Sequence, residues 1–332
     1  MEKILILGGT NFIGRNLVDS LKQLDNFEIT LFNRGQTNPE LHKEIKNISG
    51  DRNTSDINQI FNKKWDYIID LSCYFPDSLD NILKNIGSSP KRYLFISTCS
   101  VYDNEKNKSI LRNEDPPILS CNDSERTDES FLSYGKRKAE CERILKQSGL
   151  RYSILRPSLV YGQYDNTDRL YYWLYQLKSG NRLLIPNRGK SKFSVTYVKD
   201  LVQVIIKLLN INSDSNIYNV TTFPQLSISE LVNIASKVLG KMATLQFADS
   251  KFLHEHDVAQ WTDLPLWLDC DYFTYDNKKL LNELKIQMTE FKDSVSSTID
   301  YYESLSWQEP KYGMNERLKN ELIDKLHKLN NS

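Results

Sequence analysis

Residues 1–14 of the chain, MEKILILGGTNFIG, join a short apolar run to a glycine turn. Residues 4–7 are apolar without a break, which is typical of a strand buried on both faces of a parallel sheet. Gly8 and Gly9 end this run, and apolar residues recur at helical spacing from Ile13 onward. A strand, a glycine turn and a helix in this order aim backbone N–H groups at a phosphate. The stretch therefore predicts a phosphate-binding βα turn, with an ordinary tight turn as the alternative.

The middle position of the glycine pattern is occupied by asparagine. The spacing is Gly8-x-x-Asn11-x-x-Gly14, so Asn11 stands where a glycine is expected. Asparagine tolerates left-handed backbone better than most residues. We therefore expect the turn to form with Asn11 in that conformation.

Length and composition bound the class of protein. At 332 residues the chain can form one large domain or two closely associated ones. Its 43 basic and 43 acidic side chains balance, which argues against a strongly basic nucleic-acid surface. The five cysteines contain no C-x-x-C pair, so we expect reduced thiols in a cytoplasmic protein. Charged residues precede the first strand, which argues against a signal peptide, and no apolar run approaches the ~18 residues of a membrane helix.

Strands and helices are expected to alternate in the first half of the chain. Strands are predicted near residues 27–33, 45–51, 65–72, 92–98 and 152–157, and helices over 56–62, 78–86 and 133–147. This alternation predicts a Rossmann-type, doubly wound parallel sheet over residues 1–160. Residues 161–332 are assigned to a smaller, mixed substrate-binding part, from which strands near 192–220 return to the first domain.

Two further stretches break this alternation. Residues 103–130 are polar and contain Pro116 and Pro117, which predicts a long loop, either a solvated insertion or a lid over a site. From Lys241 the chain is expected to be irregular until an amphipathic helix over residues 315–329.

Tyr134 and Lys138 form a candidate acid–base pair. They stand four residues apart in the helix predicted at 133–147, and hence on one face of it. An ammonium beside a phenol favours the phenolate, which would make Tyr134 a usable acid or base near neutral pH. A surface helix with a packed tyrosine and a solvated lysine is the alternative.

Hydroxyl side chains gather where the strand at 92–98 ends. Ser97 and Thr98 lie there, followed by Cys99. Ligands of open α/β sheets bind at the carboxyl ends of the strands, so a hydroxyl there can hold the substrate oxygen whose proton Tyr134 moves. The alternative role for these hydroxyls is to cap the strand end.

These motifs, in this order, resemble the extended short-chain dehydrogenase/reductase superfamily, and within it the NAD-dependent epimerase/dehydratase group. Further likenesses are LRP at 155–157, YG at 161–162, FSVTYVKD at 193–200 and YNV at 218–220. The stretches LFNRG, GDR, WDYIIDLS and LPLWL are similar to an atypical branch near the chloroplast stem-loop-binding proteins. The resemblance covers most of the chain.

The resemblance implies a role for each matching residue. Tyr134 is the implied acid/base, Lys138 holds the cofactor ribose, and Thr98 is the catalytic hydroxyl residue, with Ser97 the second choice. The glycine turn holds the pyrophosphate, and Asp51 contacts the adenine. The expected substrate contacts are Ser97, Cys99, Asp165, Asp168 and Arg169. The expected cofactor contacts are Gly8, Gly9, Thr10, Asn11, Phe12, Ile13, Gly14, Asn33, Arg34, Asp51, Arg52, Leu71, Ser72, Tyr134, Lys138 and Pro157.

Two departures from the family pattern bear on the reaction and the cofactor. Cys99 and Ser100 stand where a sugar-nucleotide 4,6-dehydratase carries an Asp-Glu pair, which disfavours that chemistry. The second strand ends in Asn33 and Arg34, without the carboxylate that bonds the ribose hydroxyls of NAD. Arg34, assisted by Arg52, can meet a 2′-phosphate with a planar fork, so NADP is predicted, with NAD as the alternative.

The sequence therefore predicts an NADP-dependent reductase or epimerase acting on a carbonyl or carbinol of a small molecule, such as a nucleotide sugar. The competing interpretation is a non-enzymatic cofactor-binding or RNA-binding protein, against which the charge balance weighs. No membrane association and no metal site are predicted, and a homodimer through the Tyr134 helix is an expectation of the family alone. Lys136 and Arg137 are interpreted as a solvated helix face, and His254 and His256 as surface residues.

Overall fold

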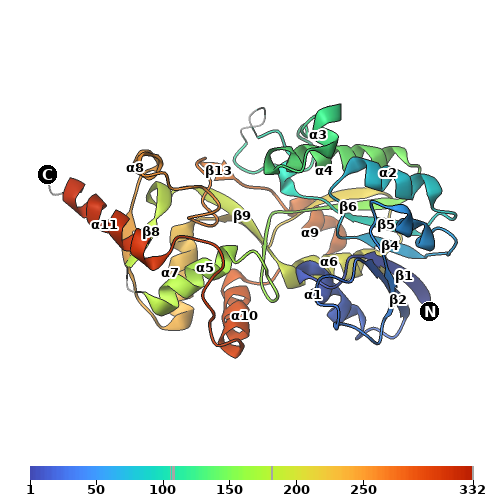
Figure 1. Cartoon of the computed structure of the whole chain (residues 1–332), viewed down its shortest axis with the longest axis horizontal. Coiled ribbons are helices and arrows are strands. Elements are labelled where there is room, and N and C mark those ends of the chain that lie inside the picture. Colours follow the sequence, from blue (N-terminus) through green and yellow to red (C-terminus); the bar gives the residue numbers. More distant parts are fainter. Residues whose placement is uncertain (105, 107–108, 181, 331–332) are drawn as a thin grey trace. The chain divides into compact units, whose positions relative to one another are not determined.

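A computed structural model describes residues 1–104, 106, 109–180 and 182–330 of the chain (Figure 1). The chain divides into two compact units. The first comprises Met1–Ser158, Val198–Thr221 and Asp276–Gln287, and the second comprises Leu159–Tyr197, Thr222–Tyr275 and Met288–Ser332.

The first unit is built on a seven-stranded parallel sheet in the order β3-β2-β1-β4-β5-β6-β10. Its strands are β1 (Glu2–Leu7), β2 (Phe27–Asn33), β3 (Lys46–Ser49), β4 (Tyr67–Asp70), β5 (Arg92–Ile96), β6 (Tyr152–Pro157) and β10 (Asn216–Val220). Its helices are α1 (Phe12–Leu21), α2 (Pro76–Asn85), α3 (Asp123–Thr127), α4 (Phe131–Gln147), α6 (Val198–Leu209) and α9 (Lys278–Leu284), with short 3-10 turns η1 (Ser55–Ile60) and η2 (Cys99–Val101). The prediction of a doubly wound Rossmann-type sheet is confirmed, and the strand order reverses between β1 and β4.

Helices cover both faces of this sheet, which is why its central strands are apolar throughout. Helices α1 and α6 pack together on one face, and α2 and α4 on the other (Figure 1). Ile4, Leu5, Ile6 and Ile68 are fully buried between these layers. The carboxyl ends of the parallel strands therefore meet at one edge of the sheet, where the glycine turn and the Thr98 segment lie.

The second unit contains a four-stranded sheet and a two-stranded one. In the larger sheet β9 pairs with β7, β11 and β13, and in the smaller one β8 pairs with β12. The strands are β7 (Leu159–Tyr161), β8 (Arg182–Ile185), β9 (Lys192–Tyr197), β11 (Phe223–Leu226), β12 (Thr244–Phe247) and β13 (Tyr272–Phe273). The helices are α5 (Arg169–Ser179), α7 (Ile228–Leu239), α8 (Ser250–Glu255), α10 (Phe291–Ser304) and α11 (Glu316–Asn330), with a 3-10 turn η3 (Pro186–Gly189).

Two expectations about the later part of the chain need correction. Strand β9 belongs to the second unit, because its partners are strands of that unit, and only β10 lies in the seven-stranded sheet. The region after Lys241 is not irregular, since it forms β12, α8, β13, α9 and α10. Phe291, Val295 and Ile299 are buried at helical spacing in α10, but serines and threonines between them obscured this pattern.

Within the described part of the chain, no helix combines the length and the apolar character that crossing a bilayer requires.

Candidate functional site

The glycine turn joins β1 to α1 by an unusually close approach of backbone to backbone. Gly8 and Gly9 both have positive φ, +113° and +109°, which side chains other than glycine rarely adopt. A Cβ at Gly14 would lie 2.6 Å from the Cα of Gly9, so glycine is needed where the helix meets the turn. The first N–H groups of α1 are thereby presented at the carboxyl edge of the sheet, in an arrangement that fits a pyrophosphate.

The expectation of a left-handed Asn11 is wrong. Its φ is −126° and its ψ is 158°, which is extended backbone, and its side-chain oxygen accepts the N–H of Phe12 at 3.0 Å. Asn11 is therefore the N-cap of α1, a position that asparagine favours, while Gly8 and Gly9 supply the left-handed conformations.

The segment after β2 is folded back onto the glycine turn. The Asn33 side-chain oxygen accepts the N–H of Gly35 at 2.8 Å, and the Asn38 amide donates to the carbonyl of Thr10 at 2.8 Å. Arg34 lies between them and is exposed. The side chain of Asn33 therefore holds the turn, and Arg34 is the cation that this segment presents to solvent.

Arg52 does not lie free beside Arg34, which corrects the expectation that both could meet a 2′-phosphate. Its guanidinium is buried and binds both carboxylate oxygens of Asp70, at 2.6 and 2.9 Å, while its Nε donates to Ser78 at 2.8 Å. Burial opposes ionisation of Asp70, but the Arg52 guanidinium outweighs it and lowers the pKa of Asp70 below its ordinary value. These bonds commit Arg52 to the core.

Other predicted cofactor residues flank the same edge of the sheet. The Ser72 hydroxyl donates to the carbonyl of Leu7 at 3.1 Å, and Leu71 lies against Gly8. The Asp51 carboxylate accepts the N–H of Asn53 at 2.9 Å, next to η1. Pro157 is the last residue of β6, and Ile13 lies in the first turn of α1.

Lys138 ties α4 to the ends of two strands. Its side chain is 2% exposed, and its ammonium donates to the carbonyl of Cys73, beyond β4, at 2.9 Å and to that of Ile96, the last residue of β5, at 2.5 Å. An ammonium has three donors, so one remains for a ligand or a neighbouring hydroxyl. Lys138 is therefore a buried cation at the carboxyl edge rather than a solvated surface residue.

Tyr134 lies one turn before Lys138, where α4 packs closely on η2. A Cβ at Gly135 would clash with the carbonyl oxygen of Ser100, so glycine permits this contact. Thr98 caps η2, because its Oγ1 accepts the N–H of Ser100 at 3.1 Å. The structure thus packs the turn of α4 that carries Tyr134 and Gly135 against the segment that begins at Thr98.

Tyr74 belongs to this site although the sequence did not indicate it. Its ring lies 6.3 Å from that of Tyr134, centroid to centroid, and 5.5 Å from the Lys138 ammonium. Arg137, expected on a solvated face, is buried and donates to the carbonyl of Tyr74 at 3.1 Å, whereas Lys136 pairs with Glu125. No local pattern could have revealed this clamp, because its two ends lie 63 residues apart.

Ser97 and Cys99 were expected to contact substrate, and the structure corrects both. The Ser97 hydroxyl donates to Glu142 at 2.6 Å, and Glu142 binds the Arg156 guanidinium at 2.5 and 2.9 Å. The Cys99 thiol is fully buried and donates to the carbonyl of Arg156 at 3.1 Å. Both side chains belong to this buried network, which leaves Thr98 as the candidate hydroxyl.

The loop at residues 103–130 is attached to the first unit at several points; residues 105, 107 and 108 lie outside the described part. Leu119 donates its N–H to the carbonyl of Val101 at 2.7 Å, and the Arg112 carbonyl accepts the amide of Asn219 at 3.0 Å. Asn122 caps α3 through a capping box with Glu125. The described part of the loop is therefore attached beside η2 and β10, while most of its side chains stay exposed or half-buried.

The second unit holds the other predicted substrate residues. Asp165 is buried, and its Oδ1 accepts the N–H and the hydroxyl of Thr167 at 2.8 and 2.7 Å. Asp168 has a left-handed φ of 53° and accepts the N–H of Lys311 at 2.8 Å, while the Arg169 guanidinium lies 5.1 Å from the Trp261 ring. These side chains are held by contacts within the second unit, and their role toward substrate stays a prediction.

Replacing Asp165 by asparagine is expected to stabilise the protein above pH 7. Burial raises the pKa of Asp165 from 3.8 to about 6, so the ionised carboxylate opposes folding at neutral pH, and this penalty fades as the pH falls through 6 toward 4. We expect a gain on the order of 1 to 3 kcal/mol at pH 7.5 and none near pH 4, measured by denaturant titration at both pH values. An exposed control, Asp324→Asn, should change stability by less than about 0.5 kcal/mol. A variant Asp165→Asn less stable than the wild type at pH 7.5 would contradict this role of burial.

The histidines and cysteines form no metal centre in the part of the chain that the structure describes. His254 pairs with Asp269 at 2.8 Å, and His256 bonds to the carbonyl of Phe252. The five cysteines are free thiols, and the sulfurs of Cys73 and Cys141 lie 4.0 Å apart in the core.

A doubly wound parallel sheet with a glycine turn at its first βα junction is the architecture of a dinucleotide-binding protein. Residues 4–221 match the model of the NAD dependent epimerase/dehydratase family. The chain belongs to this family.

Individual relatives are distant. Over 255 residues the chain is 25% identical to chloroplast stem-loop binding protein of 41 kDa b from Arabidopsis thaliana. This match covers 72% of the chain and 64% of that protein, so the chain spans less than two thirds of this relative. It is 23% identical to N-acetyl-alpha-D-glucosaminyl-diphospho-ditrans,octacis-undecaprenol 4-epimerase from Escherichia coli O157:H7, over 72% of the chain and 73% of the relative. UDP-glucuronic acid 4-epimerase from Bacillus cereus, solved with NAD, has the same fold, with a TM-score of 0.69 and 19% identity over 92% of this chain and 100% of that one. The family model thus shows the family, and the solved neighbour shows the fold.

Proposed function

We propose that the protein is an NADP-dependent oxidoreductase or epimerase acting on a carbonyl or carbinol carbon of a sugar-like small molecule, with NAD as the alternative cofactor. The observation that carries the proposal is the attachment of α4 at the carboxyl edge of the sheet. Lys138 bonds to carbonyls beyond β4 and β5, and Gly135 lets the Tyr134 turn pack on the Thr98 segment. A buried cation, a phenol and a hydroxyl are thereby gathered where an open α/β sheet binds its ligands.

In the proposed chemistry these residues transfer one proton to or from the substrate oxygen. Tyr134 gives its phenolic proton to a substrate carbonyl oxygen, or takes the hydroxyl proton when the reaction runs in reverse. The ammonium of Lys138 favours the phenolate form of Tyr134 and keeps one donor for a ribose hydroxyl, while Thr98 orients the substrate oxygen. A bound nicotinamide would supply or accept the hydride. The backbone of Gly8, Gly9, Thr10 and the start of α1 would hold its pyrophosphate.

For the substrate we propose a sugar carried on a diphosphate. The relatives that support this class act on an undecaprenol-diphospho sugar or on UDP-glucuronic acid, according to their names. Dehydration is disfavoured, because the position of the acid pair is taken by Cys99, whose thiol is buried against Arg156, and by Ser100. Asp165, Asp168 and Arg169 remain proposed substrate contacts.

The choice between the two cofactors is proposed to depend on Arg34. With Arg52 bound to Asp70, Arg34 is the exposed cation at the end of β2, and a single guanidinium can still bind a 2′-phosphate through two parallel hydrogen bonds. Arg34→Glu is expected to weaken NADP(H) binding about tenfold or more and to leave NAD(H) within about threefold, because it places a carboxylate against the phosphate. Titration of both cofactors into wild type and variant checks this, with Arg182→Glu as a distant control. Tighter binding of NAD(H) than of NADP(H) by the wild type would reverse the assignment.

RNA binding is the second candidate, and its support is the name of the chloroplast relative. Two basic residues, Lys136 on α4 and Arg126 on α3, are paired with Glu125, Asp77 and Glu140. Phosphate-driven RNA binding must weaken steeply with salt. Salt-sensitive gel shifts unaffected by Tyr134→Phe would favour this reading over the enzyme. A cytoplasmic location and a homodimer stay predictions.

A further inference from the structure

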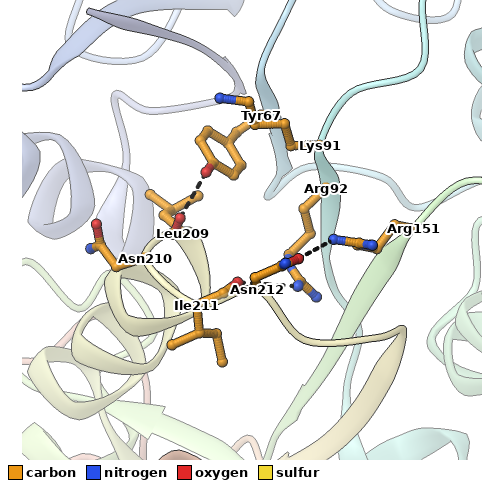
Figure 2. Close-up of a pocket in the computed structure, with 8 residues that line it drawn as sticks. All are labelled: Tyr67, Lys91, Arg92, Arg151, Leu209, Asn210, Ile211 and Asn212. Atoms are coloured by element: carbon orange, nitrogen blue, oxygen red, sulfur yellow. Dashed lines mark hydrogen bonds between the residues drawn. The ribbon is translucent and has the colours of Figure 1, made fainter.

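A polar hollow lies in the first unit, at the opposite edge of the sheet from the glycine turn. It has a volume of about 270 Å³, room for about nine waters. Tyr67 and Arg92 begin β4 and β5, Arg151 immediately precedes β6, and the chain leaving α6 closes the remaining side (Figure 2). We call it the amino-edge hollow; its lining residues are Tyr67, Lys91, Arg92, Arg151, Leu209, Asn210, Ile211 and Asn212.

Arg92 is a buried cation in the wall of this hollow. Its side chain is 2% exposed, and it donates to the carbonyl of Ser213 at 2.7 Å, to the hydroxyl of Ser153 at 2.8 Å and to the carbonyl of Asp214 at 3.3 Å. These acceptors are all neutral. Within the described residues no carboxylate lies within 4.0 Å of this guanidinium, and the Asp214 carboxylate acts on it from longer range. Burial and the neighbouring Arg151 both lower the pKa of Arg92, as expected for a cation without a close counter-ion.

Arg151 brings a second positive charge to the same place. It donates one hydrogen bond to the side-chain oxygen of Asn212 at 2.6 Å, and no ion pair with a described carboxylate is formed (Figure 2). The end of α6, where Tyr67 donates to the carbonyl of Leu209, contributes about half a negative charge. Neither guanidinium forms an ion pair with a described carboxylate, so both positive charges are compensated only from longer range. At the far side of the hollow, Lys91 is already matched by Glu2 and Asp66, at 2.5 and 3.2 Å.

We propose that the amino-edge hollow binds a phosphate group, with Arg151 and the Asn212 amide as hydrogen-bond donors and Arg92 as the buried charge. Arg151 keeps four guanidinium N–H donors after its bond to Asn212, enough for a bidentate contact with a phosphate. The phosphate can be free or part of a nucleotide, since both present the same oxygens. The site lies at the amino ends of the strands, so it is separate from the candidate active site, and it does not depend on the proposed reaction.

Equilibrium dialysis of the full-length protein with radiolabelled inorganic phosphate tests this site. NADP at saturation blocks the glycine turn, and sodium chloride keeps the ionic strength constant. We expect one phosphate site in the wild type, weakened tenfold or more by Arg151→Gln and left within twofold by the control Arg317→Gln, an exposed arginine of the second unit. Asn212→Asp, an exposed position, is a second variant that should weaken phosphate equally by placing a carboxylate beside Arg151.

Competition with AMP distinguishes the two sources. AMP and unlabelled phosphate are each used to displace the labelled phosphate. If AMP displaces it at the lower concentration, the site is assigned to a nucleotide. If the two are equally potent, the site is assigned to the free ion. Phosphate binding that is unchanged in both Arg151→Gln and Asn212→Asp would overturn the proposal. Displacement of phosphate by an equal concentration of chloride would overturn it too, because it would show general screening rather than a site.

Discussion

Tyr134→Phe is expected to bind cofactor as tightly as the wild type and to lose two to four orders of magnitude in turnover. The variant keeps the ring that lies beside Tyr74 and removes only the hydroxyl, so the fold and the glycine turn are left intact. Positioned acid–base groups contribute about 10²- to 10⁴-fold, which sets the size of the loss. Turnover is measured by NMR on UDP-glucose and UDP-glucuronic acid, and cofactor affinity by fluorescence titration.

Tyr74→Phe is the matched control for this experiment. It removes a second phenolic hydroxyl from the same site, on a ring that lies 5.5 Å from the Lys138 ammonium. Because no proton transfer is assigned to Tyr74, its variant should keep turnover within about fivefold of the wild type. Turnover of Tyr134→Phe within tenfold of the wild type, or an equal loss in both variants, would contradict the assignment of the acid–base role to Tyr134.

Asp70→Asn is expected to produce the largest loss of stability, about 3 to 5 kcal/mol. Asp70 is fully buried and binds Arg52 through both oxygens, and it also accepts the Tyr93 hydroxyl at 2.8 Å. Removing its charge leaves the Arg52 guanidinium buried without a counter-ion, which is the costly way to break such a pair. The exposed pair Asp80–Lys84 supplies the control, and Asp80→Asn should cost less than about 0.5 kcal/mol.

The Asp70 effect should also depend on pH, with a defined sign. Although burial raises the pKa of Asp70, its interaction with Arg52 prevails, and the pKa in the folded protein is below 3.8. The stabilisation by Asp70 is therefore present above about pH 4 and is lost as the pH falls through the pKa of Asp70 in the folded protein. The free energies of unfolding of wild type and variant should therefore converge in acid. Trp65 lies in the first unit, and the ¹⁹F signal of fluorotryptophan at this position follows the unfolding of that unit by denaturant. A loss under 1 kcal/mol at pH 7 would show that Arg52 remains satisfied without Asp70.

The glycine turn and the order of strands could be predicted because their signals are local. Some twenty residues contain an apolar run, two glycines and a helical repeat of apolar residues. Each of these features restricts the conformation of its own stretch of backbone. The role of Asn11 was misjudged because the same residue type serves both left-handed turns and helix N-caps. Its neighbours decide between the two, and here Gly8 and Gly9 already provide the left-handed backbone.

The hydrogen-bond partners of buried polar side chains could not be predicted, because the spacing of residues in the sequence does not indicate which side chains meet in the fold. Arg52, which follows β3, was expected beside a 2′-phosphate. Asp70 ends β4, which β2 and β1 separate from β3 in the sheet, and it binds both terminal nitrogens of Arg52. Ser97 and Thr98 are neighbours in the strand end and differ in fate, since only Ser97 faces Glu142. Arg137 likewise became a clamp on Tyr74 rather than a solvated residue.

The sequence by itself determined a parallel α/β protein with a phosphate-binding turn and a Tyr134–Lys138 pair on one helix face. Backbone restriction, apolar periodicity and helical geometry are enough for those conclusions. Only the tertiary structure decided which cations remain available: Arg34 at the carboxyl edge, Arg151 at the amino edge, and one donor of Lys138. The physical reason is that a buried charge takes whichever partner the packed chain brings within hydrogen-bond distance, and that partner can lie anywhere in the sequence.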